Sequence, residues 1–312
     1  MIKFCLIKSP FQISLVMALF LIVWLQAFSF VGAANPNDVW VSTNNSIAEY
    51  TQSGTLLTSS ISVPYGGGAR PVTELSRDLI IGLNGAIHIY NGTFDPYLSI
   101  YYPITSTWTH ETYSGWSTVN NVSYGGIARY QKYIFLTDMT TFGDGGADEA
   151  KGIVRYDTGN DTFLRFADTI EFIDLNRGLD GLLYALRSDE TSVDVYDPLT
   201  NNLVRTLNLG TGVRGIAVNE EGDIFGASWD GNIYHFDANG VQLNSVSSGT
   251  NDLTDIDITC EGQIAVGARF GEVIFSDESL TTVTFFDTGS SPTFVAFSDP
   301  RTSCVYLPVI IR

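Results

Sequence analysis

An aromatic residue followed by a small polar residue recurs along this chain at an interval close to 40 residues. The clearest copies are Tyr156-Asp157, Tyr196-Asp197 and Phe236-Asp237. Each ends an alternating apolar stretch and stands before a turn rich in Gly, Asn or Asp, a pattern that ends a β-strand and starts a hairpin. A period of this length is typical of four-stranded units repeated around a ring.

Six copies of this pair can be found, the others being Tyr50-Thr51, Tyr90-Asn91 and Phe275-Ser276. Their spacings are 40, 66, 40, 40 and 39 residues. A second series of apolar positions marks expected inner strands: Val72, Ile127, Ile173, Ile216, Ile256 and Val295. Comparing the two series predicts that the long interval holds two insertions, in 91–126 and 137–152, and no missing unit.

Between the two series lie expected middle strands, at 38–42, 78–83, 133–137, 182–186, 223–228 and 263–268. They are short β-branched and aromatic runs bounded by turn residues. The first unit lacks an inner strand of its own, whereas 293–298 is an inner strand with no unit after it. We therefore predict an all-β, six-bladed β-propeller over 35–300, closed by a C-terminal strand that completes the N-terminal blade.

The N-terminal segment 1–34 carries Lys3 and Lys8, a long apolar stretch and small residues at Gly32, Ala33 and Ala34. This order predicts a secretory signal peptide, with an uncleaved membrane anchor as the alternative. No second stretch approaches spanning length, so no membrane span is expected in the mature chain. The expected location is secreted, extracellular or associated with the cell surface.

The formal net charge is −18, which repels phosphate backbones and argues against nucleic acid as a partner. Two cysteines follow the signal segment, Cys260 and Cys304. In an exported chain they predict one disulfide across the seam of the ring, with two unpaired thiols as the alternative. The three histidines show no metal-ligand spacing.

The stretch VYDPLTNNLVRTLNLGTGVRGIAV (195–218) resembles the YVTN-type propeller repeats of secreted and surface-layer proteins. DGNIYHFDANG (230–240) resembles NHL or PQQ-type blades equally well. These resemblances imply the fold and leave the activity open, because propellers include enzymes, receptors and scaffolds. The tail 301–312 ends in CVYLPVIIR and resembles endings of exported bacterial proteins, so it is either a sorting element or a segment packed on the seam.

In a propeller, the loops after each outer strand share one face with the loops between the two middle strands. We expect this face to collect a candidate ligand rim: Arg70, Trp116, Arg187, Arg214, Trp229, Asp230, Arg269 and Phe270. Guanidinium groups beside aromatic rings suit a carboxylate or a stacked sugar. The alternative is that these arginines pair with neighbouring acids and have a structural role.

Two insertions offer further candidates. The acidic, glycine-rich loop at 137–152 holds Asp138, Asp144, Asp148 and Glu149, which are hard oxygen ligands suited to calcium, although their spacing matches no calcium-loop motif. The alternative is a solvated loop. The segment 91–126 is rich in aromatic residues and is either a contact surface or a long hairpin packed on its blade.

No catalytic motif is found: G-x-S-x-G, H-E-x-x-H and the P-loop are all missing. The sequence therefore predicts a binding or scaffold module that recognises a protein or carbohydrate ligand on the channel-mouth face. The alternative is a metal-dependent hydrolase or lyase, similar to propeller lactonases, with Asp174 and Asp257 pointing into the central channel.

Overall fold

The computed structural model describes residues 35–43, 46–63, 77–82, 84–91, 98–111, 113, 125–138 and 151–298. All of them belong to the unit Asn35–Arg312. These residues form β-strands joined by turns and loops, and within these ranges there is no helix. None of the described residues belongs to a helix long and apolar enough to cross a membrane.

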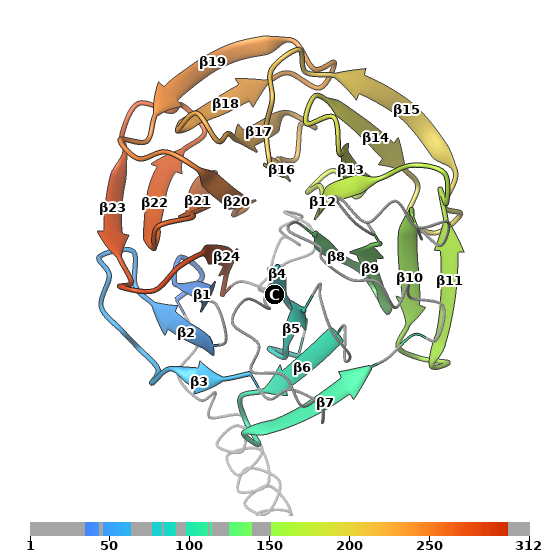
Figure 1. Ribbon diagram of the computed structural model, residues 1–312, viewed down its shortest axis with the longest axis horizontal. Helices are drawn as coiled ribbons and strands as arrows, with labels where there is room; N and C mark the ends of the chain where they lie inside the picture. Colours follow the sequence, from blue (N-terminus) through green and yellow to red (C-terminus); the bar gives the residue numbers. More distant parts are fainter. Residues whose placement is uncertain are drawn as a thin grey trace, which may run out of the picture. The chain divides into compact units, whose positions relative to one another are not determined.

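The strands form six four-stranded antiparallel sheets, which we call blades 1 to 6, arranged around a central channel (Figure 1). Blade 1 contains β24 (Thr293–Phe297), β1 (Val39–Thr43), β2 (Ser46–Tyr50) and β3 (Ile61–Ser62). Blade 2 contains β4 (Asp78–Ile81), β5 (Ile87–Tyr90), β6 (Leu98–Tyr102) and β7 (Thr107–Glu111). Blade 3 contains β8 (Ile127–Tyr130), β9 (Tyr133–Thr137), β10 (Ile153–Asp157) and β11 (Thr162–Phe166).

The remaining three blades are the most regular. Blade 4 contains β12 (Phe172–Arg177), β13 (Leu183–Arg187), β14 (Ser192–Tyr196) and β15 (Leu203–Asn208). Blade 5 contains β16 (Gly215–Val218), β17 (Ile224–Ala227), β18 (Asn232–Phe236) and β19 (Gln242–Ser247). Blade 6 contains β20 (Leu253–Ile258), β21 (Gln263–Ala268), β22 (Glu272–Asp277) and β23 (Thr284–Asp287).

The predicted closure of the ring is confirmed. Strand β24 pairs antiparallel with β1, with Val39 opposite Phe297 and Val41 opposite Val295. The innermost strand of blade 1 therefore comes from the other end of the described chain (Figure 1). Six blades, and the role of the C-terminal strand, are as the sequence predicts.

The repeated aromatic-acid pair has two physical roles. Its aromatic ring is buried between blades: Tyr156 and Tyr196 are nearly inaccessible, and Phe236 is fully buried. The following aspartate accepts hydrogen bonds from the backbone of the hairpin turn, as Asp237 Oδ1 does from Asn239 N and Val241 N, both at 2.9 Å. The three copies that carry an aspartate therefore each anchor a third strand and shape the turn after it.

The hydrophobic core lies between the blades. Six apolar clusters are found among the described residues, and each spans one junction between neighbouring sheets. The cluster between blades 4 and 5, for example, joins Leu186 and Val193 to Ile216 and Phe236. Face-to-face packing of this kind makes each blade depend on its two neighbours for burial.

Blade 2 differs from its predicted strand assignment. The segment 78–83, predicted as a middle strand, contains the inner strand β4, and Tyr90, predicted to end a third strand, ends the second strand β5. Two successive strands of this blade end in an aromatic residue, Tyr90 and Tyr102, and only their pairing shows which is the third. The predicted inner position Val72 lies outside the described residues.

The corrected strand assignment also changes the predicted insertion at 91–126, because part of this segment belongs to blade 2 itself. Strands β6 and β7 occupy 98–111, inside the segment predicted to be an insertion. Their aromatic side chains pack within the blade, since the ring of Tyr101 lies 4.9 Å from that of Trp108. The second predicted insertion is confirmed by the long connection between β9, which ends at Thr137, and β10, which begins at Ile153.

Candidate functional site

Most of the predicted rim residues that the structure describes lie on one face of blades 4 to 6. We call this the rim face, formed by the loops between second and third strands and by those leading into the inner strands. Arg187 ends β13, Arg214 directly precedes β16, Trp229-Asp230 lies between β17 and β18, and Arg269-Phe270 lies between β21 and β22. Arg70 and Trp116 lie outside the described residues.

An ion-pair chain joins these loops across three blades. Arg214 contacts Glu190 of blade 4 (Nε to Oε1, 3.5 Å) and Asp252 of blade 6 (Nη1 to Oδ1, 3.4 Å). Arg269 contacts the other oxygen of Asp252 at 3.8 Å. Glu190 and Asp252 were not predicted, and the sequence carries no signal for them beyond their place in loops.

The backbone holds the same loops together. Asp252 N donates to the carbonyl oxygen of Trp229, and Arg269 N donates to that of Asp252, both at 2.9 Å. Trp229, Asp252 and Arg269 are therefore adjacent, and Phe270 follows in the chain. We call Glu190, Arg214, Trp229, Asp252, Arg269 and Phe270 the rim cluster.

Three side chains of the rim cluster face solvent. Trp229 is 55% exposed, Phe270 is 61% exposed, and the side chain of Arg269 is 64% exposed. Large aromatic side chains exposed beside a weakly paired guanidinium are typical of the centre of a binding surface. The rim cluster can thus offer stacking faces together with a charged fork that has spare donors.

Two predicted rim residues have local roles instead. Arg187 makes a bidentate pair with Asp194, whose side chain is fully buried, through Nη2 to Oδ1 at 2.7 Å and Nε to Oδ2 at 3.1 Å. Thr206 Oγ1 also donates to Asp194, at 2.6 Å. The Asp230 carboxylate accepts from Tyr234 Oη at 2.7 Å and from Asn232 N at 2.9 Å. Both pairs brace the middle strands of their own blades.

Of the four predicted calcium ligands, Asp138 is the one that the structure describes. Asp138 is buried and pairs with Arg165, so one of its oxygens is already engaged. Asp144, Asp148 and Glu149 lie outside the described residues, and the calcium site stays a prediction. Cys260 lines the central channel, whereas Cys304 lies outside the described residues, so the disulfide likewise stays a prediction.

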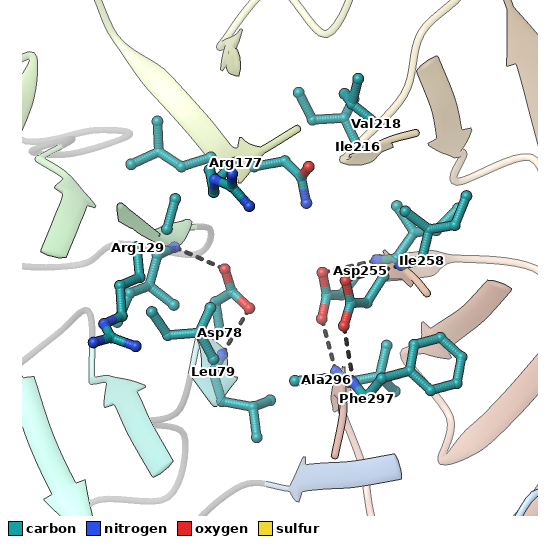
Figure 2. Close-up of a pocket in the computed structure, with 18 of the residues that line it drawn as sticks. Asp78, Leu79, Arg129, Arg177, Ile216, Val218, Asp255, Ile258, Ala296 and Phe297 are labelled. Atoms are coloured by element: carbon teal, nitrogen blue, oxygen red, sulfur yellow. Dashed lines mark hydrogen bonds between the residues drawn. The ribbon is translucent and has the colours of Figure 1, made fainter. Parts of the chain in front are cut away.

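The central channel contains a cavity of ≈ 120 Å³ bounded by the inner strands (Figure 2). Asp174 and Asp257 line it, as the sequence predicts, and so do Asp78 and Asp255, for which no such position was predicted. Asp78 was missed because β4 was taken for a middle strand.

Each of these four carboxylates bridges two neighbouring inner strands. Asp174 accepts from Leu175 N at 2.8 Å with one oxygen and from Ile216 N of blade 5 at 2.7 Å with the other. Asp78 makes the same pair of bonds to Leu79 N and to Ile127 N of blade 3 (Figure 2). Blades 2, 4 and 6 thus supply the carboxylate that accepts the hydrogen bond. Blades 3, 5 and 1 supply the backbone N–H that donates it.

Asp255 and Asp257 both bridge blade 6 to β24. Asp255 binds Ile256 N and Val295 N, each at 2.7 Å, and Asp257 binds Ile258 N and Phe297 N, each at 2.8 Å. The seam that closes the ring therefore carries two such bridges. Because every carboxylate already accepts from two backbone N–H groups, the first role of this acidic ring is to fasten inner strands to one another.

Burial raises the pKa of these carboxyl groups above their ordinary value of 3.8. The pKa of Asp174 rises to about 7 and that of Asp257 to about 6, mainly because burial removes water from the charged form. The pKa values of Asp78 and Asp255 are raised by burial and by the charges of the neighbouring carboxylates.

These shifts predict the pH dependence of stability. A raised pKa in the folded state means that folding takes up protons. The contribution of Asp174 and Asp257 to the free energy of unfolding is therefore complete below pH 3.8 and is lost as the pH rises through about 6 to 7. We expect the free energy of unfolding to be about 2–4 kcal/mol larger near pH 5 than near pH 8. Urea titrations across this interval measure it.

The matched control is Asp174→Asn, which cannot titrate at this position. Its plot of unfolding free energy against pH should be flatter than that of the unmodified protein between about pH 5.5 and 8. Equal slopes in the two proteins, or stability that increases with pH, would contradict a buried acid with a raised pKa.

The described residues do not form a metal centre: among them, no group of three or more His, Cys, Asp or Glu side chains is arranged to hold a metal ion. The channel carboxylates point into one cavity, but their oxygens are bonded to backbone N–H groups. The geometry of this part of the chain therefore gives no support to the metal-dependent hydrolase or lyase.

Solved structures share the fold. The chain is similar to a protein in the nidogen/laminin complex (TM-score 0.63, 10% identity, 85% of this chain and 99% of that one). It is also similar to streptogramin B lyase (TM-score 0.56, 16% identity, 83% and 82%) and to the RRP9 WD40 repeats (0.52, 12%, 81% and 78%). No protein-family model and no curated protein matches the sequence. At these identities the similarity shows a β-propeller and does not extend to activity.

Proposed function

We propose that this protein is an exported or cell-surface propeller that binds a protein or carbohydrate ligand at the rim cluster. The observation that carries the proposal is the exposure of Trp229 and Phe270 beside Arg269 on one face of adjacent blades. Propellers of similar fold include one from a protein–protein complex, which supports a binding role. The apolar N-terminal segment supports export.

The chemistry of the rim cluster suits either ligand class. The faces of Trp229 and Phe270 can stack on a sugar ring or receive a side chain, and Arg269 can donate two parallel hydrogen bonds to a carboxylate. Asp252 keeps Arg269 in place at a distance of 3.8 Å, which leaves that guanidinium available for a ligand.

The test is a comparison of two phenylalanines. Phe270→Ala removes a 61%-exposed ring from the rim, and Phe285→Ala removes a 67%-exposed ring from the outer strand β23. Probed against a glycan array and a displayed peptide library, the protein should yield ligands whose affinity drops at least about tenfold in Phe270→Ala and Trp229→Ala. Phe285→Ala should bind as the unmodified protein does.

Ligands that lose affinity equally in both phenylalanine variants, or that survive Trp229→Ala and Phe270→Ala together, would contradict the assignment to the rim. A glycan hit and a peptide hit would be separated by competition with the free sugar or the free peptide. Retention of a stoichiometric metal ion after purification and dialysis would instead favour the hydrolase or lyase.

A further inference from the structure

The channel holds two basic side chains on neighbouring inner strands. Arg129 lies on β8 and Arg177 ends β12, and both line the cavity (Figure 2). A Cβ atom on Gly126 of blade 3 would touch Asp174 and Leu175 of blade 4. Because Arg129 and Arg177 lie three residues beyond Gly126 and Asp174 on strands running the same way, they occupy the same level of the channel.

Neither guanidinium is closely paired in the ranges that the structure covers, although the negative charge of Asp180 acts on Arg177. Arg129 and Arg177 make no hydrogen bond and no ion pair there, and each keeps a buried N–H without an acceptor, Nη1 of Arg129 and Nε of Arg177. The guanidinium of Arg177 lies 5.7 Å from the ring centre of Tyr130. A buried donor without an acceptor is costly, and one common explanation is an ion that binds there.

The two arginines differ in position. In Figure 2 the Arg177 side chain lies beside the end of β12, closer to the middle of the channel than the end of the Arg129 side chain, which points outward toward blade 2. Burial, and after it the charge of Arg129, lowers the pKa of His88 of β5 to about 4. Arg177 is therefore the closer of the two to the cavity.

The rest of this level is apolar. The positions equivalent to Arg129 and Arg177 on the other four inner strands are Ile81, Val218, Ile258 and Phe297, all of which line the cavity. By strand position, one side of the channel at this level is thus cationic and the opposite side is hydrocarbon. A ligand with one anionic group and a small apolar body matches both sides.

The channel carboxylates repel an anion only weakly at the level of Arg129 and Arg177. Asp174 precedes Arg177 by three residues of extended strand, a separation of about 10 Å. Asp257 lies closer to the level of Arg177 along the channel, since it directly precedes Ile258. Both of its oxygens accept backbone hydrogen bonds, however, and burial raises its pKa. The charge of Asp180 also acts on Arg177, but the Asp180 carboxylate already accepts from Tyr184 Oη at 2.7 Å and from Leu182 N at 3.0 Å. Arg129 and Arg177 are the basic side chains that line the cavity.

We propose that this end of the channel binds a small organic carboxylate, held by the guanidinium of Arg177 with help from Arg129. The site lies toward the turns between first and second strands, at the end of the inner strands opposite the rim cluster. It is independent of the rim ligand, so either proposal can fail without the other.

Calorimetric titration of the purified protein with sodium butyrate tests the proposal, with sodium chloride as the control for ionic strength. Butyrate should bind at one site. Arg177→Gln should weaken it at least about tenfold and Arg129→Gln by a smaller factor, because the guanidinium of Arg129 lies farther from the middle of the channel. Arg205→Gln on the outer strand β15, away from both proposed sites, should leave the affinity unchanged.

A second measurement guards against a folding defect. Without ligand, Arg177→Met should be at least as resistant to heat as the unmodified protein, because it removes a buried donor that has no acceptor. Absence of butyrate binding, or binding that persists in Arg177→Gln, would overturn the proposal. Binding of inorganic phosphate but not butyrate would also overturn it, since the apolar wall would then have no role.

Discussion

Replacing Gly126 with alanine is expected to destabilise the ring by about 3–5 kcal/mol or to prevent folding. A Cβ atom at this position would lie 2.0 Å from Leu175 N and 2.6 Å from the carbonyl carbon of Asp174. Both atoms belong to the backbone of the next inner strand, so they cannot rotate away as a side chain would. Relief requires blades 3 and 4 to separate, which opens the core between them.

Gly212→Ala provides the matched control. The nearest atom to a Cβ there is Oε2 of Glu190 at 3.5 Å, an ordinary contact with a flexible side chain. Urea unfolding followed by tryptophan fluorescence should place this variant within about 0.5 kcal/mol of the unmodified protein. Similar stabilities for the Gly126 and Gly212 variants would show that the inner strands have room to move apart.

The second large effect is expected at the seam of the ring. Asp255→Leu removes the acceptor for two backbone N–H groups, those of Ile256 and Val295, whose residues are almost fully buried. Each unsatisfied N–H costs about 1–3 kcal/mol, part of which is offset because a buried carboxylate no longer has to be dehydrated. We expect a net loss of about 2–5 kcal/mol of unfolding free energy.

The double variant Asp255→Leu/Asp257→Leu should lose more than either single variant, because it removes both bridges to β24. Limited proteolysis should then cut the chain near β24 before any other strand. The exposed Glu220 of the turn after β16 supplies the control, and Glu220→Ala should change the stability by less than about 0.5 kcal/mol. An Asp255→Leu variant as stable as the unmodified protein would rule out the fastening role of the acids.

Both predictions follow from one alternation along the channel. At equivalent positions of successive inner strands stand Asp78, Gly126, Asp174, Gly215, Asp255 and Phe294. An acid reaches forward to the next strand, and the glycine on that strand allows the following one to approach closely. Gly215, like Gly126, would bring a Cβ against the next backbone, at 2.9 Å from the Cα of Asp255.

The features that depend on the regular spacing of the repeat could be predicted from the sequence. The number of blades follows from the spacing of the aromatic-polar pair, and the pairing of β24 with β1 follows from a first unit without an inner strand and a surplus inner strand after the last unit. Both features can be obtained by counting strands along the chain, without knowing any side-chain contact.

What the sequence could not predict depends on pairing between strands. In blade 2 both Tyr90 and Tyr102 end a strand, and the choice between them is decided by the hydrogen-bonded register. Because this strand assignment was wrong by one strand, Asp78 was not predicted to line the channel, and the alternation of acid and glycine on successive inner strands was not recognised. Glu190 and Asp252 were missed because their contacts to arginine cross from blade to blade.

The pairing of β24 with β1 also has a consequence for biosynthesis. While the chain emerges from the ribosome, β1 and β2 appear first, yet their inner partner is made last, after all the other described strands. During that interval the inner edge of β1 offers unpaired backbone groups that could capture another growing polypeptide. A chaperone that shields this edge would therefore act on the amino-terminal part of the nascent chain and release it only once Phe297 is available.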